Sequence, residues 1–339
     1  MESPGEFELI ARLTRHLTTR PEVVLGAGDD CAILDLPGPD LVLLTCDSQV
    51  EGVHFSFEIA SPEQIGRKAL AINLSDIAAM GGEPRYALVS LILPRRLSFP
   101  LLDGIYTGLH QEAERYSTAI VGGNISGAGK GEQLIIDITL VGTVERRHAL
   151  VRSGASIGDI LCVTGTLGNS AAGFSTLLHA DQQYPLDALD YVRDRHRTPQ
   201  PRIHEGRVLS QFGPGVVTAM LDISDGLSGD LWHICERSGV GARVELPQLP
   251  LSPQLRLIAT KGERDPLEWA LHGGEEYELL FTLSPGHERT VSETVLAATG
   301  TPVTKIGVIA PAEEGVKVVL ADGRQEELEV RSWDHLRAE

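Results

Sequence analysis

Both halves of the chain place acidic residues and glycines where buried strands end. Residues 41–46 (LVLLTC) form an apolar run that ends at Asp47, and residues 216–221 (VVTAML) lead into the acidic segment LDISDGL at 221–227. Strands that run into helices through such turns are typical of α/β and α+β layers, where ligand-binding groups gather at strand ends. The pattern predicts a sheet-based fold with a polar site at those ends.

The chain has 339 residues, enough for two domains with separate cores. In its first part we expect helices over 6–19, 62–80 and 99–116 and strands over 41–46, 87–93, 119–123 and 134–144. In its second part we expect strands over 160–165, 216–221, 277–283, 303–309 and 315–321, with helices from about 170, ending near 212, from about 227 and over 285–298. We therefore predict an α+β domain over 1–150 and an α/β domain over 151–339.

Composition excludes several classes of function. The net charge of −18 disfavours nucleic acid as a partner and would also repel a nucleotide unless cations lie between carboxylates and phosphates. The apolar run at 88–93 is too short to span a membrane, and the acidic N-terminus does not resemble a secretory signal, so we expect a cytoplasmic protein. The four cysteines form no C-x-x-C pair, which gives no indication of a zinc site.

Two motifs in the first third carry candidate site residues. In GAGDDCAIL (26–34) two adjacent acids follow a glycine turn, and in LLTCDSQVEGVHF (43–55) Asp47 ends a strand seven residues before His54. The first motif is also compatible with an ordinary solvated turn. A single histidine such as His54 is compatible with a structural hydrogen-bonding role as well as with ligand binding.

The segment NLSDIAAMGGEP (73–84) places Asp76 within an apolar helical pattern. Burial of an isolated carboxylate costs several kcal/mol or more, so Asp76 must be paired, capped or bound to a metal ion. An internal ion pair with Arg67 or Lys68 is the alternative to a metal-binding role.

Two further acidic motifs lie in the second half. In LDISDGL, Asp222 and Asp225 flank Ser224 at a turn from a strand into a helix, whose N-terminal N–H groups attract anions. An N-cap role would explain one of these two acids but not both. The segment LHGGEEYELLF (271–281) is compatible with a turn bearing surface acids. No G-x-x-x-x-G-K-[ST] loop occurs, so a phosphoryl-transfer enzyme would need another way to hold its metal ions.

Taken in order, these segments resemble the thiamine-monophosphate kinase family, which belongs to the superfamily of aminoimidazole ribonucleotide synthetase. The resemblance rests on GEFELIARL, GAGDDCAIL, TCDSQVEGVHF, KALAINLSDIAAMGGEP, IVGGN, RSGASIGD, VTGTLGNSAAG, LDISDGL, GGEEYEL and SWDH, which together span nearly the whole chain. It implies a two-domain α+β and α/β fold in which the N-terminal sheet forms a barrel across a homodimer. It also implies that ATP and thiamine monophosphate are the substrates and that several Mg²⁺ ions bind between the domains.

The resemblance also implies roles for individual residues. The implied metal ligands are Asp30, Thr45, Cys46, Asp47, Asp76, Asn124, Asp222 and Asp225. The implied ATP contacts are Gly123, Asn124, Arg152 and Ser224. The implied substrate contacts are His54, Glu275 and Trp333, of which Trp333 could stack on the cationic ring of the substrate. No catalytic side chain is expected, because the phosphate that attacks is already ionised and needs no general base.

The chain departs from the family pattern at two implied metal ligands. It has Asn124 where the family has aspartate, which removes a charge, and Cys46 where the family has threonine. A thiol is a poor ligand for Mg²⁺, although the backbone carbonyl of Cys46 could still serve. These departures leave two alternatives open: a related ATP-dependent enzyme with another substrate, and a weakly active or inactive nucleotide-binding paralogue.

Overall fold

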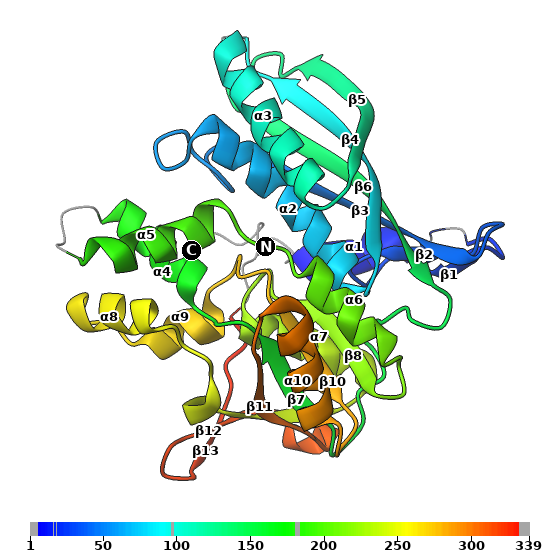
Figure 1. Cartoon of the computed structure of the whole chain (residues 1–339), viewed down its shortest axis with the longest axis vertical. Coiled ribbons are helices and arrows are strands. Elements are labelled where there is room, and N and C mark those ends of the chain that lie inside the picture. The colour runs from blue at the N-terminus through cyan, green and yellow to red at the C-terminus, as the bar shows by residue number, and fades with distance from the viewer. Residues whose placement is uncertain (1–5, 16, 18, 96–97, 180–183, 332–339) are drawn as a thin grey trace.

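The computed structural model describes residues 6–15, 17, 19–95, 98–179 and 184–331. Two mixed β-sheets lie one after the other along the chain, with helices packed on them and between them (Figure 1). The strands of the first sheet fall between residues 23 and 145, and those of the second fall between residues 160 and 327. The described helices include none that is long and apolar enough to cross a membrane.

The first sheet has six strands in the order β1-β2-β3-β6-β4-β5. Its strands are β1 (Val23–Leu25), β2 (Ala32–Leu34), β3 (Asp40–Val50), β4 (Glu83–Leu93), β5 (Ala119–Gly127) and β6 (Ile135–Glu145). The helices of this part are α1 (Glu6–Thr14), α2 (Pro62–Ala79) and α3 (Phe99–Arg115). Strands β4 and β5 are parallel, and α3 connects them, while the other neighbours pair antiparallel.

The second sheet has seven strands in the order β13-β12-β9-β11-β7-β10-β8. Its strands are β7 (Ile160–Thr164), β8 (Val217–Asp222), β9 (Gly241–Glu245), β10 (Leu279–Leu283), β11 (Val303–Ala310), β12 (Val316–Val319) and β13 (Gln325–Glu327). Its helices are α4 (Asn169–Leu178), α5 (Leu186–Arg197), α6 (Ile203–Gln211), α7 (Leu227–Ser238), α8 (Pro253–Lys261), α9 (Pro266–His272) and α10 (Glu288–Thr299), with short 3₁₀ turns η1 (Leu246–Gln248) and η2 (Ala312–Glu314).

Helix α2 lies between the two sheets and joins their cores. Ser61 forms a capping box with Gln64, and Pro62 occupies the first turn, so the helix has a well-defined start. The helix packs on β3, β4 and β6 of the first sheet and on β8 of the second. Close contact with α3 requires glycine at Gly66 and Gly108, where a Cβ would lie about 2 Å from a backbone carbonyl oxygen of the other helix.

The expected elements are present with shifted limits. The first helix ends at Thr14 rather than at 19. The strand expected over 277–283 begins at Leu279, because residues 273–278 form a loop that is hydrogen-bonded to the turn after β8. The pattern did not predict the strands β1, β2, β9 and β13 or the helices α5, α8 and α9. Short strands carry too few residues for an alternating pattern to be read.

The face of the first sheet turned away from α2 and α3 is not covered by another described helix (Figure 1). Tyr86 and Leu88 on β4 lie on this face, with 54% and 45% of their surface exposed, and pair with Val141 and Thr139 on β6. An exposed apolar sheet face of this kind is a candidate surface for assembly. The barrel across a homodimer stays a prediction.

Candidate active site

A cavity of about 760 Å³ lies where the first sheet, helix α2 and the second half of the chain meet. Its lining includes Asp47 at β3, Asp76 on α2 and Asp222 at the end of β8, together with Ser224 and Asp225 in the turn that follows β8. Asp222 is the last residue of β8, whereas Asp47 lies within β3, which continues to Val50 and does not end at Asp47 as expected. The lining also includes residues of the segment 52–59 and of helices α4 and α5.

Three carboxylates from distant parts of the sequence form a compact group. One oxygen from each of Asp30, Asp76 and Asp222 lies within 4.8 Å of the other two. Thr45 Oγ1 donates a hydrogen bond to Asp76, and Ser75 Oγ donates one of 2.5 Å to Asp222. Neighbouring hydroxyls therefore fix two of the three carboxylates in place.

This group is electrostatically unfavourable without a cation. Burial raises the pKa of Asp76 well above its usual value, and the charges of Asp47, Asp222 and Asp30 raise it further. Burial and the nearby Asp30 raise the pKa of Asp222 to about 8. Burial likewise raises the pKa of Asp47. Raised pKa values of this origin mean that the protein alone does not offset the repulsion among these acids.

The carboxylate group fits a hard divalent cation. Oδ2 of Asp30 is buried and has no hydrogen-bond partner among the described residues, so no protein donor uses its lone pairs. The group offers oxygen atoms only, the ligand type that Mg²⁺ prefers. Asp30, Asp76 and Asp222 could therefore hold Mg²⁺, with Asp47 and Asp225 beside them in the cavity lining.

Arg152 lies against the two acids of the first motif. Its guanidinium pairs with Asp30, its Nε lies 3.6 Å from Oδ1 of Asp29, and its backbone N–H donates to Asp29. Burial raises the pKa of Asp29 to about 7, with Asp30 adding to this effect and Arg152 opposing it. Arg152 thus joins the first motif to the start of the second half of the chain, next to the metal-binding candidates.

The loop before β10 is fixed against the turn after β8. The N–H of Glu275 donates to the carbonyl of Ser224 over 2.7 Å, and the N–H of Tyr277 donates to the carbonyl of Ile223 over 2.8 Å. Glu275 and Tyr277 have φ values of +62° and +53°, which are rare for residues other than glycine. Such backbone strain persists where surrounding contacts determine the conformation, and it is frequent at functional sites.

Glu275 connects the two parts of the molecule. Its Oε1 lies 2.5 Å from Nζ of Lys68 on α2, and its Oε2 lies 3.3 Å from Nδ1 of His196 on α5. Burial raises the pKa of Glu275, but Lys68 and His196 more than offset this effect, so the pKa lies below its usual value. Burial and the charge of Lys68 lower the pKa of His196 to about 4, which keeps its ring neutral at pH 7.

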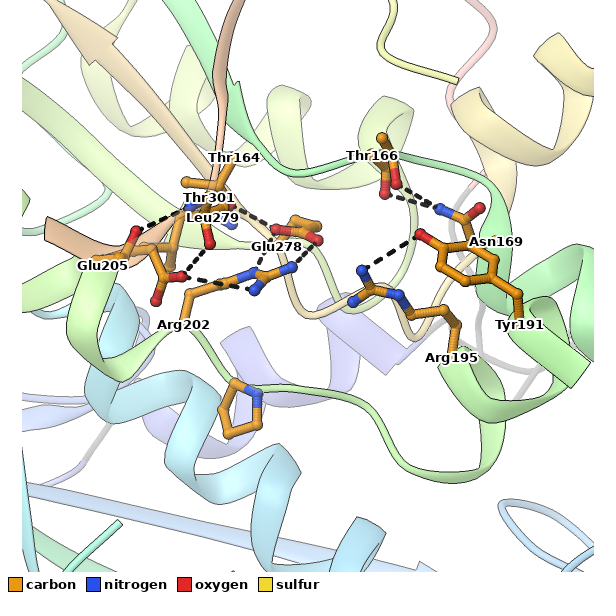
Figure 2. A network of polar contacts seen from close by, with 12 residues as sticks. Thr164, Thr166, Asn169, Tyr191, Arg195, Arg202, Glu205, Glu278, Leu279 and Thr301 are labelled. Carbon is orange, nitrogen blue, oxygen red and sulfur yellow. Dashed lines mark hydrogen bonds and ion pairs between the residues drawn. The ribbon is translucent and has the colours of Figure 1, made fainter. Parts of the chain in front are cut away.

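A buried polar network also supports the loop before β10 (Figure 2). Arg202 donates to both carboxylate oxygens of Glu278 over 2.6 and 2.5 Å, and Thr164 Oγ1 donates to Glu278 over 2.7 Å. Glu205 accepts from Thr301 Oγ1 and lies 3.5 Å from Arg202. Bidentate contacts of this kind fix the end of the loop that carries Glu275.

His54 lies in the cavity lining, on the segment that follows β3. Its Nδ1 accepts a hydrogen bond of 3.0 Å from the N–H of Val50, and its carbonyl accepts one of 3.3 Å from Lys68. The alternative reading of His54 as a structural hydrogen-bonding residue therefore has support, and its position in the cavity keeps the ligand-binding reading open as well.

The alternative ion pair for Asp76 is wrong. Arg67 pairs with Glu112 over 2.9 Å, and Lys68 pairs with Glu275, so both cations have other partners. The N-cap alternative is also wrong, because Gly226 and not Asp222 or Asp225 occupies the N-cap of α7. The turn reading of the last motif does not hold either, since Glu276 and Glu278 are buried.

Three of the implied site residues, Cys46, Gly123 and Asn124, neither line the cavity nor join the carboxylate group. The side chain of Cys46 points to the uncovered face of the sheet, where Thr139 Oγ1 donates to it. Gly123 and Asn124 lie on the exposed edge strand β5, and Asn124 pairs in register with Ser90. At Gly123 a Cβ would lie 1.7 Å from the carbonyl oxygen of Val89, so glycine is required there. Trp333 lies outside the described residues.

Several residues of the site were not identified from the sequence. The sequence suggests Lys68 only as a partner for Asp76. Ser75 lies in the segment 73–84 without a predicted role, and no motif contains His196 or Arg202. The one usable signal was the position of Lys68 on the apolar pattern of α2, where a buried cation needs an acidic partner.

Comparisons with known proteins agree with this architecture. The family model described as AIR synthase related protein, N-terminal domain, matches residues 28–144, and the corresponding C-terminal domain model matches residues 156–319. The thiamine-monophosphate kinase of Bacillus subtilis (strain 168) is 35% identical over 333 residues, which are 98% of this chain and 99% of that protein. The thiamine-monophosphate kinase of Escherichia coli (strain K12) is 38% identical over 98% of both chains.

Solved structures give the same result. The structure titled "AaThiL complexed with AMPPCP and TMP" matches with a TM-score of 0.83 and 37% identity, over 98% of this chain and 97% of that chain. The thiamine-monophosphate kinase of Stenotrophomonas maltophilia K279a matches with a TM-score of 0.76 and 34% identity, over 94% and 97% of the two chains.

Proposed function

Because the chain belongs to the thiamine-monophosphate kinase family and has its two-domain AIR synthase-like fold, we propose that it transfers the γ-phosphoryl group of ATP to thiamine monophosphate. The product is thiamine diphosphate. The observation that best supports this reaction is that Asp30 in the loop before β2, Asp76 on α2 and Asp222 at the end of β8 meet beside a large cavity.

We propose that the metal ligands are Asp30, Thr45, Asp47, Asp76, Asp222 and Asp225. Mg²⁺ bound there would supply the positive charge that lets two phosphate groups approach each other. The chain itself fixes the carboxylates through Thr45, Ser75 and Arg152 before the substrates bind. Cys46, through its backbone carbonyl, and Asn124 stay predictions from the family resemblance, since their side chains lie on the other face of the sheet.

ATP is proposed to bind at the turn after β8, with Arg152, Ser224 and Gly123 among its contacts. The turn leads directly into α7, whose first backbone N–H groups lack helical partners and attract phosphate oxygens. Arg152 adds a cation beside the acids, which lowers the repulsion between them and the nucleotide.

Thiamine monophosphate is proposed to bind in the same cavity, with His54 and Glu275 in contact with it and Trp333 as a further contact. Since Nδ1 of His54 accepts a hydrogen bond, the neutral ring carries its proton on Nε2, which makes Nε2 a donor suited to a phosphate oxygen. No side chain is assigned as a general base, because the attacking phosphate oxygen is already ionised.

We propose that residues 1–150 and 151–339 are the two domains and that two copies associate through the uncovered face of the first sheet. The exposed Tyr86 and Leu88 and the open edge strand β5 support this surface. We place the enzyme in the cytoplasm, where ATP and Mg²⁺ are available together.

The direct test is an assay of purified, folded protein with ATP, Mg²⁺ and thiamine monophosphate, followed by chromatography of the products. Formation of thiamine diphosphate in proportion to ADP supports the proposal. ATP hydrolysis without thiamine diphosphate, or turnover with a different phosphate acceptor only, rejects the substrate assignment and favours a related ATP-dependent enzyme.

A further inference from the structure

The part of the cavity lined by α4 differs in chemistry from the aspartates. Its lining there is largely apolar and includes Ile59, Ala171, Phe174 and Leu178. Phe174 and Leu178 are one turn apart on α4 and are 41% and 58% exposed, so their side chains are available to a ligand in the cavity. A phosphorylated ligand whose phosphate lies at the aspartates would place its remaining part against these residues.

Phe174 has a fixed neighbour. Its ring lies 5.0 Å from the ring of His196, measured between centroids, with 34° between the planes. His196 is itself held by Ser170 Oγ at 3.2 Å and by Glu275 at 3.3 Å. Its neutral ring adds no positive charge beside Phe174. The aromatic side chain therefore has a supported orientation before a ligand arrives.

Glu275 offers no unpaired carboxylate to a ligand in this part of the cavity. Both of its oxygens have partners, Lys68 and His196. Outside the aspartates, the other charged side chains in the described lining are Glu58 and Arg331, which carry opposite charges. A cationic ligand group in this part of the cavity would therefore gain little binding energy from an ion pair with Glu275. An aromatic face is the alternative, because its quadrupole attracts a cation.

We propose that Phe174 is the surface on which the cationic heteroaromatic ring of the phosphate acceptor stacks, and that it determines selectivity for that ring. This inference rests on the proposed function, since it takes the acceptor to be a phosphate ester with a positively charged ring. Phe174 contacts the ring and takes no part in the transfer of the phosphoryl group.

The experiment compares two ligands with two proteins. Competitive inhibition constants and KM are measured for thiamine monophosphate and for its neutral analogue in which carbon replaces the thiazolium nitrogen, with the wild type and with Phe174→Leu. In the wild type we expect the cationic ring to be favoured. In Phe174→Leu we expect KM for thiamine monophosphate to rise about three- to tenfold and the preference for the cation to fall by a similar factor, with KM for ATP unchanged.

Three controls make the result specific. Phe174→Tyr keeps the aromatic face and should behave like the wild type. Leu178→Ala removes apolar surface from the same helix and should weaken both ligands alike, while Glu58→Gln tests whether that carboxylate is the group that selects the cation. Equal ligand preference in the wild type and Phe174→Leu, or loss of preference in Glu58→Gln alone, overturns the inference.

The two proposals fail in different ways. If the wild type forms no thiamine diphosphate but binds thiamine monophosphate in calorimetry, the proposed function fails, and the ligand comparison is then made by binding. If thiamine diphosphate forms and the ligand preference does not depend on Phe174, only the inference fails. Absence of both binding and turnover overturns both.

Discussion

Nζ of Lys68 on α2 lies 2.5 Å from Oε1 of Glu275, so an ion pair joins the helix of the first sheet to the loop before β10. The side chain of Lys68 is 5% exposed and that of Glu275 is 29% exposed. Loss of one partner of such a pair leaves a poorly solvated charge, at a cost of about 3–5 kcal/mol when burial is complete and less here. The pair also fixes Glu275 in its strained conformation.

Lys68→Met should therefore lower the free energy of unfolding by about 2 kcal/mol and raise KM for thiamine monophosphate about five- to twentyfold. The double variant Lys68→Met/Glu275→Gln should recover part of the stability. Arg67→Met is the matched control, because Arg67 lies next to Lys68 and pairs with Glu112. Urea unfolding and steady-state kinetics check both effects. An equal rise of KM for thiamine monophosphate in Lys68→Met and Arg67→Met would show that Lys68 has no specific role at the site.

Glu276 gives a prediction for pH. It is buried, its side chain accepts a hydrogen bond of 2.9 Å from the N–H of Ser170, and burial raises its pKa to about 8. A carboxyl group with a raised pKa in the folded state is protonated there at pH values where the unfolded chain is ionised. Its contribution to stability is therefore present at low pH and is lost as the pH rises from about 4.5 to about 8.

Glu276→Gln keeps the acceptor but cannot ionise. Relative to the wild type, its free energy of unfolding should increase between pH 5 and pH 8, by at most about 1.4 kcal/mol per pH unit. Urea unfolding at several pH values, at one magnesium concentration, measures the difference. A difference that stays constant with pH would mean that Glu276 is ionised in the folded protein throughout this range.

Much of the site could be predicted from the sequence because its acids follow strand ends and glycine turns, which are local patterns. Asp222 and Asp225 could be identified in this way, whereas Asp47 lines the cavity from within β3 and not from the end of that strand. The partners of the acids in the cavity could not be predicted in this way. Ser75 and Asp222, like Lys68 and Glu275, are more than 140 residues apart in the sequence. Long-range pairs leave no local signal.

The direction of the Cys46 side chain could have been predicted from the sequence. Thr45, Cys46 and Asp47 are consecutive residues of β3, and side chains alternate between the two faces of a strand. Thr45 and Asp47 therefore share the face toward α2, while Cys46 faces the other way, and the three side chains cannot all reach one group. The family resemblance alone did not reveal this alternation.

Asn124→Asp tests whether the departure at this position limits activity. We expect turnover at saturating Mg²⁺ to equal or exceed that of the wild type, because the substitution restores the charge that the family has there. Asn124 is exposed on β5, so the fold should tolerate the change. Turnover is measured against Mg²⁺ concentration. A folded variant without activity would show that the asparagine itself is needed.

Leu88→Asp tests the assembly surface. Leu88 lies on the uncovered face of the first sheet and is 45% exposed. If this face forms the dimer interface, Leu88→Asp buries a carboxylate there, which is strongly unfavourable. We expect the wild type to be a dimer and Leu88→Asp a monomer in size-exclusion chromatography with light scattering. Phe99→Asp, at the 82% exposed first residue of α3, should remain dimeric. A monomeric wild type, or a dimeric Leu88→Asp, contradicts this surface.

The proposed reaction depends most on the carboxylate group of Asp30, Asp76 and Asp222. Its most direct test is the anomalous scattering from Mn²⁺ in crystals grown with a non-hydrolysable ATP analogue. We predict anomalous peaks about 2.0–2.3 Å from carboxylate oxygens of these three residues. Bound nucleotide with no peak near them, or with Mn²⁺ held only by residues elsewhere, would contradict the account.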